Sequence, residues 1–200
     1  MNERRTDLWC ALLLIAITTL LFADVLFFGN NFWFRDLFVY HFPMKRIVRD
    51  TILRGEFPWW NPNWSGGQPM AANPAYEVFY PPQWLIFIGS YPFGFALHIV
   101  AHIWIALLGM YAFLRSIPLR AAAAMFGALS FGFSGFFLGT MTNLPTFFVW
   151  SWAGVVKVSG GSLSSIEVSK AKTTLCVAAA PSTPSSWTTR TRAQLVGPLR

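Results

Sequence analysis

The feature that most constrains this chain is a set of long apolar runs with almost no charge inside them. The first run covers residues 8–28, and as a helix it would reach roughly 31 Å, about the thickness of a bilayer's hydrocarbon core. A cleaved signal peptide is the alternative, since Arg4 and Arg5 precede the run. The run is too long for a signal core and no small-residue cleavage site follows it, which favours a membrane span.

Three further apolar segments follow the first one. Residues 84–114 exceed one span and are interrupted near Gly89, so we interpret residues 84–88 as an interfacial piece and residues 93–114 as the second span. Residues 121–138 form a third span rich in small residues, which allow close helix packing in lipid. After a short loop at 139–146, residues 147–156 begin a fourth span. The pattern predicts an all-α, polytopic transmembrane protein with three to four spans.

Composition supports a membrane protein and excludes other classes. Only 12% of the residues are charged, against about 25% in soluble domains, and 20 Phe and 10 Trp suit lipid-facing helices and interfacial belts. The net charge of +7 is dispersed around the apolar runs, so no nucleic-acid partner is expected. Cys10 and Cys176 match no metal or redox spacing.

The distribution of basic residues predicts the topology. Arg4 and Arg5 precede the first span, and Arg115 and Arg120 flank the turn between the second and third spans. The positive-inside rule places these ends in the cytoplasm, so loop 29–83 is extracytoplasmic. That loop also holds five Lys or Arg residues, which is a mild argument against this placement.

The composition changes at the tail, residues 157–200. Trp187 is the one aromatic residue after Lys157, and Ser and Thr become frequent there. The fourth span stops after too few apolar residues to cross a bilayer. Two interpretations stay open: a flexible, disordered polar tail, or a shift of the reading frame near residue 156, beyond which the natural protein continues as further helices.

The first loop contains an acidic residue with candidate chemistry. If residues 32–43 are helical, Asp36, Tyr40 and Pro43 share a face. A carboxylate at a membrane surface can act as a general base toward a hydroxyl, or can bind a divalent cation such as Mg²⁺ or Mn²⁺. The alternative is an ordinary interfacial aspartate paired with Arg35 or Arg46. No metal site with defined ligands is predicted.

Residues 44–54 have the pattern of an amphipathic helix that lies in the membrane interface. The apolar stripe consists of Met44, Ile47, Val48 and Ile52, and the polar stripe of Lys45, Arg46, Arg49, Asp50 and Arg54. Asp50 precedes Arg54 by four positions, the favourable order for a helical ion pair, and Gly55 is placed as a C-terminal cap. The cations either bind a lipid phosphate or anchor the helix at the surface.

The rest of the loop, residues 56–82, is rich in proline and glycine, so no regular element is expected. Its aromatic residues can stack on sugar rings or anchor the loop at the interface. The folded loop must give the polar side chains of Asn61, Asn73 and Glu77 hydrogen-bond partners, or use them for function.

His98 and His102 share a face of the second span. They suggest a packing or loop-facing hydrogen-bond role, a metal pair, or a proton path in a transporter.

With these motifs in view, the chain resembles the YfhO-like bacterial membrane proteins, which are similar to the GT-C class of glycosyltransferases. The resemblance covers roughly residues 8–156 and rests on the order of many short motifs: Arg35-Asp36-Leu37, Tyr40, Pro43, Gly55-Glu56, Pro58 to Pro62, Gly66 to Pro69, Ala72 to Pro74, Tyr80 to Pro82, His102, Gly109 to Tyr111, Leu114-Arg115, Gly127-Ala128, Phe133 to Gly135, Asn143 and Trp152.

The resemblance implies a membrane glycosyltransferase with a large first extracytoplasmic loop, in the bacterial inner membrane. It implies a polyprenyl-phosphate-linked sugar as donor and an acceptor on the outer face. Asp36 matches the catalytic acid of that loop, and Leu37 follows it, so this chain has no acidic pair there. We expect a lipid-phosphate site at Arg35, Lys45, Arg46 and Arg49, and a sugar site and its supporting loop at Tyr40, Trp59, Trp60, Asn61, Asn73 and Tyr80.

Two alternatives remain beside the enzyme. One is a non-catalytic membrane protein that binds or moves lipid-linked glycans. The other is a transporter fragment that uses the two histidines of the second span. If the chain is the N-terminal part of a longer enzyme, it stays open whether this part has glycosyltransferase activity by itself.

Overall fold

The computed structural model describes residues 3–159, apart from residues 33, 65 and 118. This part of the chain is mostly helical, which confirms the predicted all-α class. The predicted tail lies outside the described residues from residue 160 onward. The elements are α1 (Glu3–Leu21), α2 (Ala23–Phe27), the π-helical η1 (Leu37–His41), α3 (Phe42–Leu53), β1 (Trp60–Asn61), β2 (Gln68–Pro69), the 3-10 helix η2 (Pro81–Phe87), α4 (Tyr91–Ser116), α5 (Ala121–Gly132), α6 (Gly135–Gly139), the 3-10 helix η3 (Thr140–Thr142), α7 (Leu144–Ser151) and α8 (Ala153–Ser159).

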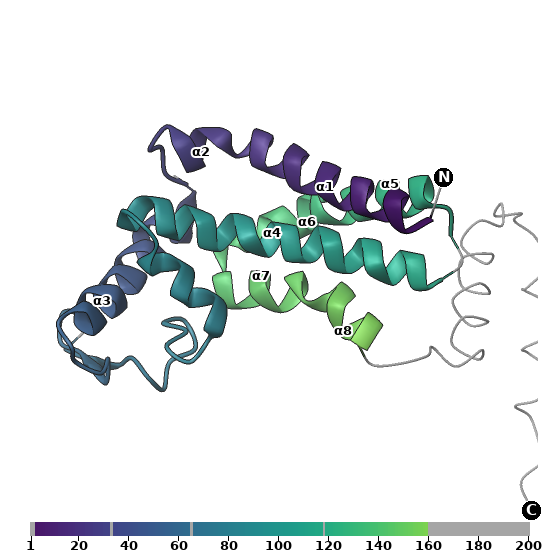
Figure 1. Cartoon of the computed structure of the whole chain (residues 1–200). Coiled ribbons are helices and arrows are strands. Elements are labelled where there is room, and N and C mark those ends of the chain that lie inside the picture. Colours follow the sequence, from purple (N-terminus) through teal and green to yellow (C-terminus); the bar gives the residue numbers. More distant parts are fainter. Residues whose placement is uncertain (1–2, 33, 65, 118, 160–200) are drawn as a thin grey trace, which may run out of the picture. The chain divides into compact units, whose positions relative to one another are not determined.

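Helix α4 lies at the centre of the described residues and packs against α1, α5, α7, α8 and η2 (Figure 1). At its C-terminal end, Arg115 Nε donates to Asp7 Oδ1 at 2.8 Å, and the Tyr111 hydroxyl donates to the same oxygen at 2.7 Å. These bonds hold the start of α1 beside the end of α4. The basic residues of the N-terminus and of the 115–120 turn therefore lie at one end, as predicted, and the side of the membrane stays a prediction.

Within the described residues, two helical stretches are long and apolar enough to cross a membrane, Tyr91–Ser116 and Ala121–Thr142. The first contains the predicted second span. The other contains the predicted span 121–138, but its helix ends at Gly132 and restarts after Ser134, whose hydroxyl accepts a hydrogen bond from Phe137 N. The predicted first span, 8–28, is divided at Phe22. The Thr18 and Thr19 hydroxyls there donate to carbonyls four residues back, a pattern that often bends helices.

The predicted loop at 139–146 is wrong. Residues 140–142 form η3, and α7 begins at Leu144 with Pro145 in its first turn, where the missing N–H of proline costs no hydrogen bond. The fourth apolar segment is also divided, because α7 ends at Ser151 and α8 continues to Ser159. Helix α8 therefore extends three residues beyond residue 156, where the fourth apolar segment was predicted to end.

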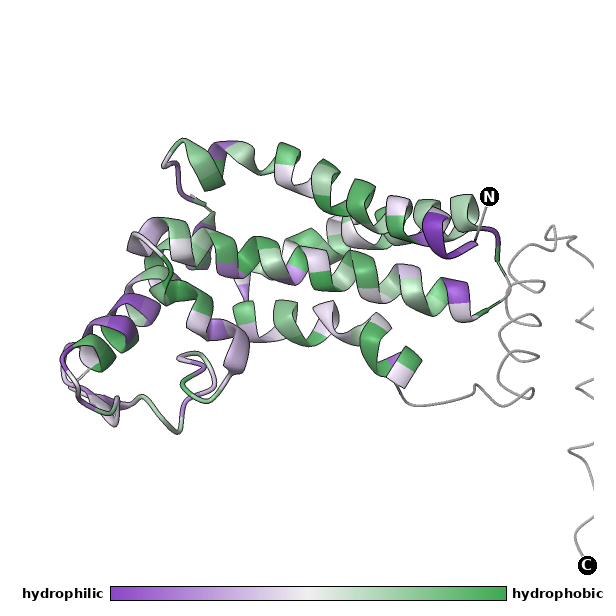
Figure 2. Cartoon of the chain, in the orientation of Figure 1, coloured by the Kyte–Doolittle hydropathy of each residue, from purple (hydrophilic) through white to green (hydrophobic). Residues whose placement is uncertain are grey.

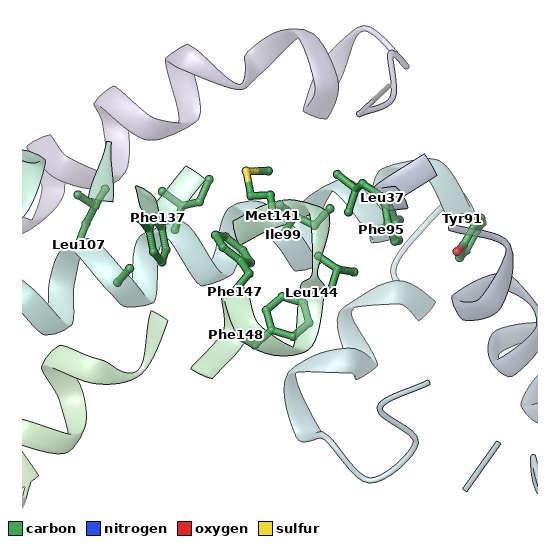
Figure 3. Packing of buried hydrophobic residues seen from close by; sticks show 12 residues of the cluster. Leu37, Tyr91, Phe95, Ile99, Leu107, Phe137, Met141, Leu144, Phe147 and Phe148 are labelled. Carbon is green, nitrogen blue, oxygen red and sulfur yellow. The ribbon is translucent and has the colours of Figure 1, made fainter. Parts of the chain in front are cut away.

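The main core lies along one side of α4, where it meets η1, η3 and α7 (Figure 3). Its fully buried residues are mostly aromatic or branched: Leu37, Tyr91, Phe95, Ile99, Ile103, Ala106, Leu107, Phe137, Met141, Leu144, Phe147 and Phe148. Apolar residues cover the long helices, and polar residues gather at α3 and the loop after it (Figure 2). That end, which corresponds to the first loop, therefore contains the candidate chemistry.

A glycine fixes the position of η2 on α4. A Cβ atom at Gly94 would lie 2.7 Å from the carbonyl oxygen of Ile86, and the nearest atoms are all backbone. The Gly94→Ala variant should therefore lower the free energy of unfolding by about 1–3 kcal/mol through overpacking. The measurement is thermal denaturation of the purified chain in detergent.

The matched control for this variant is Gly135→Ala, where a Cβ meets nothing within 4 Å. The control should be neutral or slightly stabilising, because alanine favours a helix over glycine. Equal melting temperatures for the two variants would contradict the tight contact between α4 and η2.

Candidate functional site

The segment from Arg35 to Gly55 folds as a turn followed by two joined helices. Arg35 has a φ of 40° and lies in a turn closed by the bond from Leu37 N to Phe34 O, just before η1. Helix α3 covers the predicted amphipathic helix, with Met44 and Val48 buried. The predicted cap at Gly55 is confirmed by its φ of 79° and by the bond from Gly55 N to Ile52 O.

The predicted charge pattern of this helix is partly wrong. Asp50 pairs with Arg46 at 3.6 Å, whereas Arg54 lies 3.8 Å from Glu56, so the predicted Asp50–Arg54 pair is replaced by two others. Lys45 does not lie on an exposed polar stripe, because its side chain is completely buried. The prediction from residue spacing assumed that other elements cover only one face of the helix. In the structure, η2 and the loop before it cover a second face of α3.

Lys45 instead belongs to a buried group that we call the Glu77 cluster: Lys45, Glu77, Gln83 and His98. Lys45 Nζ lies 2.7 Å from Glu77 Oε2 and donates to Gln83 Oε1 at 2.7 Å. Burial lowers the pKa of Lys45 to about 8, and the Glu77 carboxylate opposes that shift. The ammonium group is therefore still mostly charged at pH 7 and forms a buried ion pair.

His98 completes this cluster from α4. Its Nδ1 lies 2.9 Å from the carbonyl oxygen of Pro82, and because a carbonyl can only accept, Nδ1 carries the proton. Its Nε2 lies 3.4 Å from Glu77 Oε2. His98 therefore packs against the carboxylate on the side of Oε2, the oxygen that Lys45 also approaches.

A second chain of hydrogen bonds runs beside the cluster. Trp152 Nε1 donates to the Tyr80 oxygen at 2.6 Å, and the Tyr80 hydroxyl lies 2.7 Å from His102 Nε2. His102 Nδ1 lies 2.6 Å from the His98 carbonyl oxygen, which fixes Nε2 as the acceptor for Tyr80. Burial raises the pKa of Tyr80. Both histidines therefore bind the loop, as one of the open interpretations predicted.

Two cavities have residues of the stretch 73–75 in their walls, and both are lined by Pro145. The Asp36 cavity, of about 530 Å³, is lined by Asp36, Val39, Tyr40, His41, Trp64, Ala75, Thr142, Asn143 and Pro145. The Glu77 cavity, of about 380 Å³, is lined by Ala71, Asn73, Pro74, Glu77, Val78, Phe79, Tyr80, Pro145, Phe148, Val149 and Trp152. Both volumes lie in the range of small-molecule sites.

The structure divides the predicted sugar residues among three places. Tyr40 lies with Asp36 in the first cavity, and Asn73 and Tyr80 lie in the second. Trp59 and Trp60 are exposed and line neither cavity. Asn61 is completely buried and donates to the Tyr76 hydroxyl at 2.9 Å, which is a structural role.

The short pairing of β1 with β2 explains where the two tryptophans lie. Trp60 is opposite Pro69 in an antiparallel pair, although no regular element was expected in this stretch. A Cβ atom at Gly67 would lie 2.5 Å from the Trp60 ring. The indole therefore packs closely on Gly67, where no other side chain fits, and it lines neither cavity.

The predicted phosphate-binding cations are also separated. Arg46 is largely exposed on α3, and Arg49 donates to the Gly89 carbonyl at 3.1 Å. Arg35 is exposed at the turn before η1. Arg35 and Arg46 are therefore exposed, Arg49 is half-buried against the Gly89 carbonyl, and Lys45 is enclosed by its ion pair.

The sequence pointed to Glu77 as a polar group that the folded loop must satisfy or use, but did not place it in the candidate site. Its carboxylate is buried and its φ of 54° is in the left-handed region, which is unusual for a residue other than glycine and typical of functional sites. A further, indirect signal was the histidine pair on one face of the second span, since buried histidines need polar partners and the loop contains Glu77.

A divalent cation is not well supported by the side chains at Asp36. Within the described residues there is no group of three or more His, Cys, Asp or Glu side chains that could hold a metal ion. The Asp36 cavity offers one carboxylate and one imidazole, that of His41. This donor set is smaller than the six oxygen-rich ligands that Mg²⁺ requires.

His41 should make the stability of the chain depend on pH. Burial, and then the charge of Lys45, lowers the pKa of His41 from 6.5 to about 4. The unfolded chain therefore binds more protons between those values, so stability is complete above pH 6.5 and falls as the pH falls toward 4. The measurement is the melting temperature in detergent between pH 7.5 and 4.5.

The His41→Gln variant is the control for this dependence. It should lose most of the slope between pH 6.5 and 4.5, whichever way its stability at pH 7.5 changes. A slope identical to that of the wild type would show that His41 is not the titrating group.

Comparison with protein-family models, with curated proteins and with solved structures finds no match to this chain.

Proposed function

We propose that this chain is the N-terminal part of a membrane glycosyltransferase that takes sugar from a polyprenyl-phosphate donor. The observation that carries the proposal is the Asp36 cavity at the polar end of the helices. Its walls combine an exposed carboxylate, two aromatic rings and the polar side chains of His41 and Asn143. The resemblance of the first loop to YfhO-like proteins supports the same function.

The aromatic rings of this cavity suit a sugar. Tyr40 and Trp64 lie edge to face, with ring centroids 5.4 Å apart. Their rings offer apolar surface for the C–H face of a pyranose, and their polar atoms remain available for its hydroxyls. A cavity that contained aliphatic residues alone would not favour a hydroxylated ring over a lipid chain.

In the proposed reaction, Asp36 acts on the acceptor. Its carboxylate takes the proton of an acceptor hydroxyl while that oxygen bonds to the anomeric carbon of the donor sugar. The bond between the anomeric carbon and the phosphate oxygen breaks, and polyprenyl phosphate leaves with the bonding electron pair. No step is routed through a divalent cation.

Two arginines of α3, the exposed Arg46 and the half-buried Arg49, then stabilise the departing phosphate. Arg46 and Arg49 lie on α3, which is amphipathic and lies along the polar end of the structure. Guanidinium groups bind phosphate oxygens in a bidentate fashion. Lys45 is left out of this set, because its ammonium group is already paired with Glu77.

The test is an assay of the purified chain in proteoliposomes with radiolabelled polyprenyl-phosphate glucose as the probe. Transfer of label to a membrane extract that supplies acceptors, above protein-free vesicles, is the expected result. Binding of the donor without transfer would favour the non-catalytic alternative. Absence of both would contradict the proposal, provided that the protein retains its native melting temperature.

A further inference from the structure

The chain has more uncharged sequence around α4 than one membrane span needs. Residues 78–114 contain no Asp, Glu, Lys or Arg, whereas a span needs about 20 predominantly apolar residues. The surplus lies before α4, and we call residues 78–88 the pre-helix segment. Because charged side chains are costly in lipid, a segment without them has the composition of a part of the chain that contacts lipid.

The pre-helix segment folds back along α4. At one end, the Ile86 backbone packs so closely on Gly94 that a Cβ atom there would lie 2.7 Å from the Ile86 carbonyl oxygen. At the other end, the Tyr80 hydroxyl lies 2.7 Å from His102 Nε2. Gly94 and His102 are eight positions apart, which is about 12 Å along a helix. The segment therefore runs antiparallel to the first three turns of α4.

The far end of α4 gives a first estimate of where the membrane begins. Arg115 donates to Asp7 at 2.8 Å, and both charged residues flank apolar runs, so they mark one boundary of the hydrocarbon core. About 20 helical residues cross that core. Counted back from Arg115, they place the opposite boundary close to Phe95, in the second turn of α4.

The first apolar run gives the same boundary. It ends at residue 28, and Leu26, near that end, packs in one buried cluster with Ala96 and Val100. His102 lies about two turns farther along α4, roughly 10 Å inside the boundary. Because the Tyr80 hydroxyl bonds to His102, the pre-helix segment reaches the same depth.

The length of α4 argues against a boundary at His102 itself, which would leave the pre-helix segment in water. The stretch from His102 to Arg115 would then have to cross the hydrocarbon core alone. As a helix it reaches about 20 Å, too short for a core of about 30 Å. The first turns of α4, and the segment packed on them, therefore belong to the membrane.

Non-helical backbone lies at membrane depth only where the protein itself satisfies its polar groups. The pre-helix segment meets this condition on the side that faces α4. Pro81 and Pro82 have no N–H to satisfy, and the Pro82 carbonyl oxygen lies 2.9 Å from His98 Nδ1. The side chain of Gln83 donates from Nε2 to the Tyr76 carbonyl at 2.7 Å. Polar side chains within apolar sequence are thus used to bind the loop.

The side chains that the pre-helix segment leaves exposed are all apolar: Phe79, Pro81, Trp84 and Ile88. Phe79 is next to Tyr80, at the deep end of the segment, whereas Trp84 is near the boundary and Ile88 is at the shallow end. Phenylalanine suits the hydrocarbon core, and tryptophan is typical of the level of the headgroups.

We propose that residues 78–88 form a re-entrant segment that enters the half of the bilayer beside the first loop, where Phe79 contacts lipid acyl chains and Trp84 lies at the level of the headgroups. The interfacial piece expected at residues 84–88 is then the shallow part of a longer inserted segment. The proposal rests on the proposed placement of α4 in a membrane, and it does not depend on the reaction at Asp36.

The experiment attaches a nitroxide spin label to single cysteines of the full chain in phosphatidylcholine vesicles, with Cys10 and Cys176 replaced by alanine. Collisions of the label with oxygen, which concentrates in hydrocarbon, are compared with collisions with a water-soluble nickel complex. We expect the label at Phe79→Cys to be at least about tenfold less accessible to nickel than at Glu56→Cys, because hydrocarbon excludes polar solutes. Glu56 is the matched position, since it is exposed in the same loop.

A series along the segment separates insertion from a segment that lies flat on the membrane. The ratio of oxygen to nickel collisions should fall in the order Phe79→Cys, Trp84→Cys, Ile88→Cys, because each position is shallower than the one before. These side chains are exposed, so the fold should tolerate the changes. Equal ratios at the three positions, or nickel accessibility at Phe79 equal to that at Glu56, overturn the proposal.

Phe136→Cys is the control for the membrane placement itself. Phe136 is exposed within the helical stretch Ala121–Thr142, and its label should be as inaccessible to nickel as that at Phe79. A shielded label at Phe136 with an accessible one at Phe79 overturns the re-entrant segment alone. Accessible labels at both positions contradict the membrane placement, and the re-entrant segment with it.

Discussion

Replacing Lys45 by methionine should lower the free energy of unfolding of this chain by about 3–5 kcal/mol, the usual cost of removing one partner of a buried ion pair. Methionine fits the space of the lysine stem, so little packing is lost. The loss comes from Glu77, whose carboxylate would stay buried without the ammonium group now 2.7 Å away. The measurement is thermal denaturation in detergent, followed by tryptophan fluorescence.

Two further variants separate this explanation from a general effect of mutation. The double variant Lys45→Met/Glu77→Gln removes both charges and should recover most of the lost stability, because no uncompensated charge remains. Arg46→Met breaks the exposed pair with Asp50 and should change stability by no more than about 1 kcal/mol. A double variant as unstable as the single one would contradict the buried ion pair.

The Asp36→Asn variant should reduce the rate of sugar transfer by about 10²–10⁴-fold, the range for loss of a general base. Asparagine keeps the size of the side chain and cannot take the proton. Because Asp36 is exposed at the end of η1, the fold should tolerate the change, so the KM for the donor should stay within a few-fold of the wild type.

The matched control is Glu56→Gln, which neutralises another exposed acid of the same loop. Both side chains of its ion pair with Arg54, at 3.8 Å, are exposed. This control should keep the wild-type rate. Equal losses in the two variants would indicate an effect of loop charge on the membrane surface, not of a base at Asp36.

The long apolar helix was predictable because its signal is strong and local. An apolar run predicts a helix of about the length of α4, and Pro92 lies in the first turn of that helix. The cap at Gly55 was predictable for the same reason, since a glycine after an amphipathic stretch supplies the left-handed residue that ends a helix.

The environment of Lys45 could not be predicted from the periodicity of its helix. Spacing identifies the faces of a helix, but it does not tell how many of those faces other elements cover. The partners of Lys45 are 32 and 38 positions away, at Glu77 and Gln83, in a stretch with no periodic pattern. Contacts of that range depend on how the loop folds back over α3.

The candidate sugar residues were separated for a related reason. An aromatic residue in a loop has the same appearance in the sequence whether it lines a cavity, as Tyr80 does, or lies exposed, as Trp59 does. The direction of each ring depends on turns such as the one at Gly67. Asn61 was a plausible sugar ligand by type, and its burial against Tyr76 shows that it stabilises the loop.

The most direct measurement of the central claim compares the two candidate acids of the loop in one assay. The initial rate of transfer from polyprenyl-phosphate glucose, per mole of folded protein, is measured for Asp36→Asn and for Lys45→Met/Glu77→Gln. We predict that Asp36→Asn loses at least about 100-fold, while the double variant stays within about tenfold of the wild type. The reverse order, or full activity of Asp36→Asn, would contradict the assignment of Asp36 as the base.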